Sequence, residues 1–207
     1  VNFNMMIMVI YALITIAIFG MWYYARYEGN FLPSPKKTFN PMMLVAIVIL
    51  VPGTQFAANF IANLTGYIRP DWLQQYNELF ETSGITDTTF VTVLYSVILA
   101  PICEELIFRG VTMRCARKAL PFALANLMQA ALFGLFHLNW IQGIYAFALG
   151  IVLGYVCECG GSIYYSMGLH LLFNLWGTLS GFFPDPGNSV VVFVIVIAVT
   201  IVSLAAG

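Results

Sequence analysis

Residues 96–111 read SVILAPICEELIFRGV, an apolar run that contains three charged side chains, Glu104, Glu105 and Arg109. In the whole chain of 207 residues, only 8% of the side chains are charged and 61% are hydrophobic. A typical soluble domain has about 25% charged residues. Because so few charges cannot cover the surface of a soluble protein of this length, the sequence predicts a polytopic membrane protein. Within such a protein, three charges in one apolar segment require an explanation.

Apolar segments long enough to cross a bilayer recur along the chain. A spanning helix needs about 20 mostly apolar residues. By that measure we expect about seven spanning helices, at residues 3–25, 41–65, 89–113, 121–138, 141–158, 161–182 and 189–206. The polar stretch DWLQQYNELFE starts at Asp71, a candidate N-cap, and has its apolar side chains on one helical face. It predicts an amphipathic helix near 71–83 that lies in the headgroup region.

The predicted fold class is therefore all-α, a transmembrane helix bundle with one interfacial helix. We expect a single membrane domain over residues 1–207, with a catalytic core at 89–180. Residues 1–65 and 189–206 are expected to supply peripheral spanning helices. The net charge of −1 gives no field that would favour nucleic acid, so no nucleic-acid partner is expected.

Basic residues predict the orientation of the bundle. They follow the first and third predicted spans, at Arg26, Lys36, Lys37, Arg114, Arg117 and Lys118, whereas acidic residues dominate the loop between the second and third spans. Since basic loops remain in the cytoplasm, the amino terminus is expected outside. The run 109–118 is expected to extend the third span beyond the bilayer, so that the site opens towards the cytoplasm.

Ionisable groups within a bilayer cost several kcal/mol, so each one is a candidate functional residue. Glu105 and Arg109 are four residues apart on one helical face and can form an ion pair. Glu104 is rotated by about 100° from Glu105 and points elsewhere. This geometry predicts a structural carboxylate in Glu105, supported by Arg109, and a reactive carboxylate in Glu104.

The only two histidines of the chain, His137 and His170, also fall in predicted spans. His170 and Asn174 share a face, and Phe133 lies one turn before His137. Glu104 and His137 lie about 14 and 17 residues from the turn between their helices, which at about 1.5 Å per residue gives them a similar depth. We therefore expect these side chains to face one cavity.

Two chemical interpretations of this set are open at the level of the sequence. In the first, Glu104 and a neutral His137 activate a water, and His170 and Asn174 donate to an oxyanion. In the second, Glu104, His137 and His170 are ligands of a catalytic Zn²⁺ whose fourth ligand is water. Either arrangement hydrolyses an amide bond. A haem bound by His137 and His170 is disfavoured, because it leaves the glutamate pair without a role.

Three motifs in this order resemble those of the CPBP intramembrane proteases, which include the type II CAAX prenyl endopeptidases and the bacteriocin-processing and abortive-infection proteins. The motifs are EExxxR (Glu104, Glu105, Arg109), FxxxH (Phe133, His137) and HxxxN (His170, Asn174). The resemblance implies an intramembrane endopeptidase in which Glu104 and His137 position the attacking water. It also implies an oxyanion site at His170 and Asn174. Family members are often called metalloproteases, although a metal-free, glutamate-dependent mechanism is also argued for them.

The expected partners are membrane lipid and a peptide or membrane-protein substrate. The compact frame resembles bacterial members of the family, so we expect a bacterial cell membrane and an unprenylated substrate. A non-catalytic membrane scaffold or regulator of the same fold is the alternative, which intact motifs disfavour. A transporter is disfavoured because the sequence has no internal repeat.

Overall fold

The structure, a computed structural model, describes residues 3–27, 40–83 and 89–180, and every regular element in these ranges is a helix. The elements are α1 (Phe3–Tyr27), α3 (Pro41–Ile68), α4 (Pro70–Ser83), α5 (Phe90–Val93), η1 (Leu94–Leu99), α6 (Ala100–Glu105), η2 (Leu106–Met113), α7 (Arg114–Ala116), α8 (Phe122–Phe136), α9 (Trp140–Gly160) and α10 (Ile163–Ser180). Elements α5 to α7 follow one another without a break, and η1 and η2 are π-helical. The predicted all-α class is confirmed.

Four of the described helices are long and apolar enough to cross a membrane. They cover Phe3–Ala25, Pro41–Ile68, Phe90–Ala116 and Trp140–Gly160, and α8 is a shorter apolar helix. The predicted segments at 121–138 and 161–182 correspond to α8 and α10. The predicted span at 189–206 lies outside the described residues. The protein is thus a helical membrane bundle.

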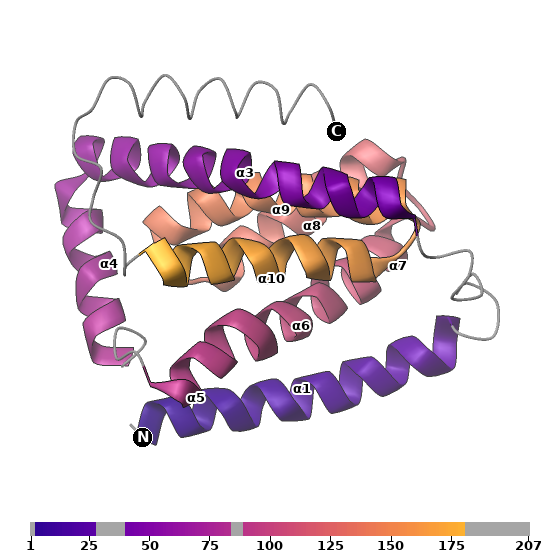
Figure 1. Cartoon of the computed structure of the whole chain (residues 1–207), viewed down its shortest axis with the longest axis horizontal. Coiled ribbons are helices and arrows are strands. Elements are labelled where there is room, and N and C mark those ends of the chain that lie inside the picture. The colour runs from indigo at the N-terminus through magenta and orange to yellow at the C-terminus, as the bar shows by residue number, and fades with distance from the viewer. Residues whose placement is uncertain (1–2, 28–39, 84–88, 181–207) are drawn as a thin grey trace.

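The helices form a bundle with two distinct ends (Figure 1). One end, which we call the α4 end, holds the start of α1, the helix α4 and the turn between α8 and α9. The opposite end, which we call the basic end, holds the end of α1, the turn between α7 and α8, and the turn between α9 and α10. Helix α4 lies across the long helices rather than along them, as expected for an interfacial helix.

The predicted amphipathic helix near 71–83 is present as α4, which begins one residue earlier than expected. Pro70 occupies the first turn, where its missing N–H costs no hydrogen bond, so Asp71 lies inside the helix rather than at the N-cap. Arg69 donates two hydrogen bonds to Asp71, and these hold the pKa of that carboxyl below its ordinary value. The Trp72 ring stacks on Trp140 at 5.4 Å and joins α4 to α9.

Glycines allow α8 and α9 to pack closely. A Cβ on Gly143 would stand 3.0 Å from the carbonyl oxygen of Gly134, and a Cβ on Gly150 would stand 3.1 Å from Ala130. A Cβ on Gly154 would overlap the side chain of Asn126. Small residues commonly permit such contacts between membrane helices.

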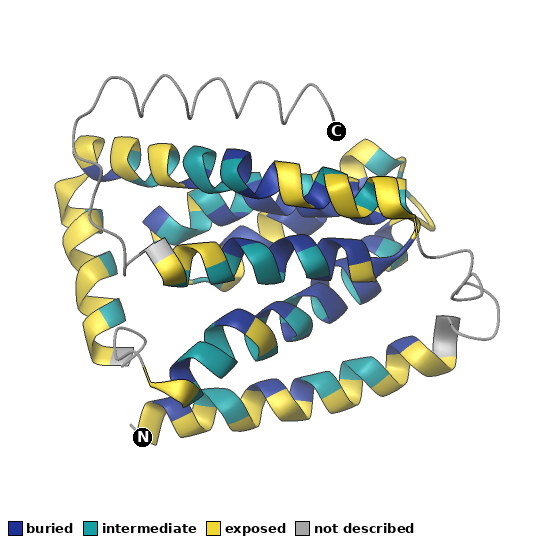
Figure 2. Ribbon diagram, in the orientation of Figure 1, coloured by how far each residue is buried: buried dark blue, intermediate teal, exposed yellow. Residues whose placement is uncertain are grey.

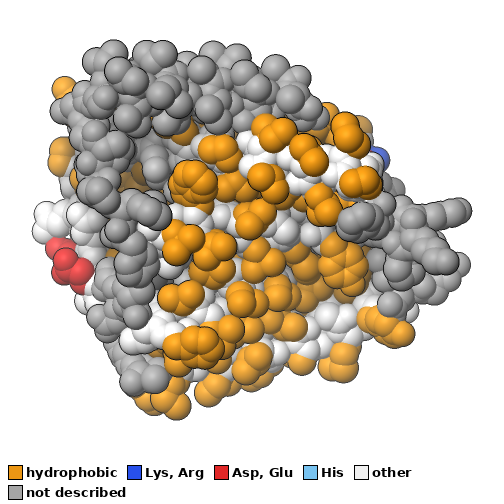
Figure 3. Space-filling view, viewed as in Figure 1, with side chains coloured by type: hydrophobic (Ala, Val, Ile, Leu, Met, Phe, Trp, Pro, Cys, Tyr) orange, Lys and Arg blue, Asp and Glu red, His pale blue; other side chains and the backbone are white. Residues whose placement is uncertain are grey.

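The outer faces of the helices are apolar, as lipid contact requires. Exposed residues cover the outside of α1 and α3, whereas the buried residues lie towards the middle of the bundle (Figure 2). In the space-filling view, hydrophobic side chains cover most of the described part of the face shown (Figure 3). The interior contains a large cluster of apolar residues from α3, α8, α9 and α10.

Candidate active site

A cavity of about 830 Å³ occupies the part of the bundle nearer the α4 end. It is lined by all four residues that the sequence analysis named as catalytic: Glu104 from α6, His137 from the end of α8, and His170 and Asn174 from α10. Phe133, the other residue of the FxxxH motif, also lines it. Elements separated by up to 70 residues therefore bring the three motifs to one cavity.

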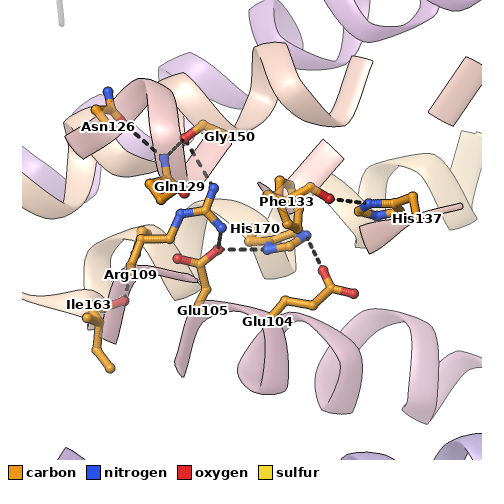
Figure 4. A network of polar contacts seen from close by, with 11 residues as sticks. Glu104, Glu105, Arg109, Asn126, Gln129, Phe133, His137, Gly150, Ile163 and His170 are labelled. Carbon is orange, nitrogen blue, oxygen red and sulfur yellow. Dashed lines mark hydrogen bonds and ion pairs between the residues drawn. The ribbon is translucent and has the colours of Figure 1, made fainter. Parts of the chain in front are cut away.

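Glu105 and Arg109 form the predicted ion pair behind the cavity. Arg109 Nη1 lies 2.8 Å from Glu105 Oε1, and both side chains are completely buried. Arg109 also donates to the carbonyl oxygen of Gly150 at 3.1 Å, and its guanidinium lies over the ring of Phe133 (Figure 4). A buried pair of this kind is tolerated because each charge has a close partner.

His170 lies between the two glutamates (Figure 4). Its Nδ1 is 2.9 Å from Glu105 Oε1, and its Nε2 is 3.6 Å from Glu104 Oε2. Because Glu105 is ionised against Arg109, its oxygen accepts and His170 Nδ1 carries the proton. The sequence analysis did not foresee this contact, since the two residues are 65 positions apart.

His137 ends α8 and is oriented by its own helix. Its Nδ1 is 2.8 Å from the carbonyl oxygen of Phe133, which can only accept, so the proton is on Nδ1 and Nε2 keeps a lone pair. The next residue, Leu138, has φ 53° and turns the chain towards α9. A left-handed leucine costs about 1–2 kcal/mol. Strain of this kind is common beside functional residues.

Asn174 donates to the carbonyl oxygen of Ser96 at 2.8 Å. Ser96 lies in the π-helical segment η1, where the N–H of Ala100 bonds to Tyr95, five residues earlier. Pro101 cannot continue this pattern to Ser96, because proline has no N–H. Asn174 supplies the donor instead, and its amide carries a second N–H that can serve a ligand.

A polar network on α8 supports the buried ion pair and was missed at the sequence level as part of the site. Gln129 donates to the carbonyl oxygen of Gly150, which also accepts from Arg109, and to the side chain of Asn126 (Figure 4). A signal was present, because Gln129 lies four residues before Phe133 and eight before His137. It therefore shares their helical face.

The three predicted zinc ligands do not form a complete metal site in this arrangement. Glu104 Oε2 and His170 Nε2 are 3.6 Å apart, a separation that two ligands of one ion can have. Across residues 3–27, 40–83 and 89–180, however, no group of three or more His, Cys, Asp and Glu side chains could hold a metal ion. His137 thus does not complete a three-ligand zinc site.

The cavity lies at the end of the bundle that holds the start of α1. The amino terminus was expected outside and the site was expected to open towards the cytoplasm. The cavity is lined by Met8 near the start of α1 and by Tyr76, Leu79 and Phe80 of α4, which lie at the same end of the bundle (Figure 1). The start of α1 and the cavity therefore share one end of the bundle.

Residues 86–176, a segment that contains all three motifs, match the family described as Type II CAAX prenyl endopeptidase Rce1-like. This part of the chain is similar to that family. The resemblance read from the motifs is thus confirmed over a little under half of the 207 residues. No curated protein and no solved structure matches the chain. The family supports an intramembrane endopeptidase of the CAAX protease type in general.

Proposed function

We propose that the protein hydrolyses a peptide bond of a membrane-associated peptide or protein. The main support for this proposal is that Glu104, His137, His170 and Asn174 line one cavity. The buried ion pair of Glu105 and Arg109 lies behind them. The Glu104 side chain is 14% exposed, whereas that of Glu105 is completely buried. Glu104 is therefore the carboxylate of the pair that a water in the cavity can reach.

The first step is attack by water. Glu104 accepts a proton from the water, and the lone pair on His137 Nε2 accepts a hydrogen bond from the same water and orients it. The hydroxide then forms a bond to the carbonyl carbon of the scissile peptide. General bases of this kind contribute about 10²–10⁴ in rate.

The second step is stabilisation of the oxyanion. His170 Nε2 and the second N–H of Asn174 are the donors that the motifs predict for this role. Because His170 Nδ1 already donates to Glu105, His170 can donate through Nε2 only as an imidazolium. At this stage Glu104 is protonated, so the charges of Glu105 and the oxyanion balance those of Arg109 and the imidazolium, and the low-dielectric site can hold the group.

The last step breaks the C–N bond. Protonated Glu104 gives its proton to the nitrogen of the leaving amine, and the products are a carboxylic acid and an amine. Glu104 thereby returns to its starting state. All steps use side chains of this chain.

The proposal is tested by comparing membrane-associated peptides, by mass spectrometry, from cells that produce the wild type, Glu104→Gln or no protein. We expect cleavage products with the wild type alone. Glu78→Gln is the matched control, because Glu78 is an exposed glutamate on α4 and should leave the products unchanged. Products that persist with Glu104→Gln would contradict the catalytic role. Identical peptides with the wild type and without the protein would favour the non-catalytic scaffold.

A further inference from the structure

The cavity is closed towards the basic end. Behind Glu104 and His170 lie Glu105, Arg109 and Gln129, and each of these three side chains is completely buried. The lining residues come from the α4-end parts of the helices and from α4 itself. Within the described ranges, a substrate therefore reaches Glu104 from the α4 end or from the lipid beside it.

The two ends of the bundle differ in charge. Six of the eight Lys and Arg residues belong to the basic end or to residues 28–39, which follow α1 in the sequence: Arg26, Lys36, Lys37, Arg114, Arg117 and Lys118. The α4 end has Arg69, which is paired with Asp71, and the acidic residues Glu78 and Glu81. Basic residues close to spanning helices remain on the cytoplasmic side.

From these two observations together, we propose that the cavity opens on the extracytoplasmic side of the membrane. The substrate is then the extracytoplasmic or outer-leaflet segment of a membrane-anchored polypeptide, a choice that rests on the proposed peptidase function. Amide side chains of Gln55, Asn59 and Gln142 line the cavity and can hydrogen-bond to an extended peptide backbone. The prediction of an outer amino terminus is kept, and that of a cytoplasmic opening is replaced.

The experiment is cysteine labelling with a membrane-impermeant maleimide in intact and in permeabilised cells. Cys115 is an exposed residue of α7 and reports on the basic end once the other exposed cysteine is removed by Cys159→Ser. For the α4 end, Cys115→Ser and Cys159→Ser are combined with Gln75→Cys, an exposed position on α4. The buried Cys103 and Cys157 remain in both proteins.

We expect Gln75→Cys to react in intact cells, and Cys115 to react only after permeabilisation. The opposite result, with Cys115 labelled in intact cells, overturns the proposal. Tyr67→Cys, at a position that is 86% exposed at the end of α3, gives a second reporter if the first variant does not accumulate. Gln142→Cys tests the cavity itself and should react from outside with a small charged thiosulfonate.

This measurement is independent of catalysis. If labelling fits the proposed orientation but Glu104→Gln still forms the cleavage products, the peptidase mechanism fails and the orientation stands. If Glu104→Gln abolishes the products but Gln75→Cys reacts only after permeabilisation, the mechanism stands and the extracytoplasmic opening fails.

Discussion

At the scale of single residues, Glu105 Oε1 is the centre of the site, because it accepts from both Arg109 and His170. One oxygen thus couples the buried cation to the imidazole that faces Glu104. This arrangement explains how two adjacent glutamates can differ in role. Glu105 is fixed by its partners, while Glu104 remains available to the cavity.

A double substitution tests the buried pair. Arg109→Met leaves Glu105 as an uncompensated buried charge, and we expect it to lower the free energy of unfolding by about 3–5 kcal/mol. Replacing both residues by methionine removes both charges and should cost less than Arg109→Met alone. Thermal unfolding in detergent measures Arg109→Met, Glu105→Met and the double variant. A double variant as unstable as the sum of the two single variants would contradict the interpretation.

Metal removal tests the chemistry at the same scale. Because the described residues lack a three-ligand site, we expect the cleavage activity to survive dialysis against a chelator of divalent cations. Elemental analysis of the purified protein provides the second readout. Stoichiometric zinc, together with activity that is lost on chelation and restored by zinc, would replace the metal-free mechanism by the alternative with three zinc ligands.

The local part of this site could be predicted from the sequence, and the long-range part could not. The pairing of Glu105 with Arg109 follows from their spacing by four on a helix. The contact of His170 with Glu105 depends on how α10 packs against α6, which no local pattern specifies. The same holds for the donation of Gln129 to Gly150, between α8 and α9.

At the scale of elements, the helix that carries the glutamates departs from α-geometry on both sides of them. The π-helical segments η1 and η2 flank α6, and such segments are frequent at functional sites. Apolar patterning predicted the helix itself, but it contains no signal for a change from four-residue to five-residue hydrogen bonds. Pro101 is a visible cause for η1, since it removes a backbone donor directly after that segment.

A double-mutant cycle tests the link between Pro101 and Asn174. Asn174→Ala removes the donor to the Ser96 carbonyl oxygen, and we expect a loss of about 1–2 kcal/mol in the free energy of unfolding. In a Pro101→Ala background the backbone N–H is restored, so the same substitution should cost less. Thermal unfolding of the four proteins gives the coupling energy. Equal costs in both backgrounds would show that the proline does not create the need for Asn174.

At the scale of the whole molecule, the separation of the basic end from the cavity connects orientation with function. The sequence analysis identified the charge asymmetry correctly from the positions of the basic residues. The end at which the cavity lies could not be predicted, because the order of motifs along a helix does not reveal which end a cavity leaves open. That information lies in α4 and the α8–α9 turn, which line the opposite end.

If charge determines the orientation, redistributing it should invert part of the population. The test variant combines Lys36→Gln, Lys37→Gln and Lys118→Gln with Gln75→Lys, Glu78→Lys and Glu81→Lys, in the Cys159→Ser background. It leaves three basic residues at the basic end and places four at the α4 end. Since the excess of basic residues sets the side that stays in the cytoplasm, Cys115 should become reactive in intact cells in a measurable fraction of molecules.

Glu78→Gln with Glu81→Gln is the control and should keep Cys115 protected. Complete protection of Cys115 in the redistributed variant would mean that features other than these charges orient the bundle, and the assignment of the cavity to the outer face would then rest on labelling alone.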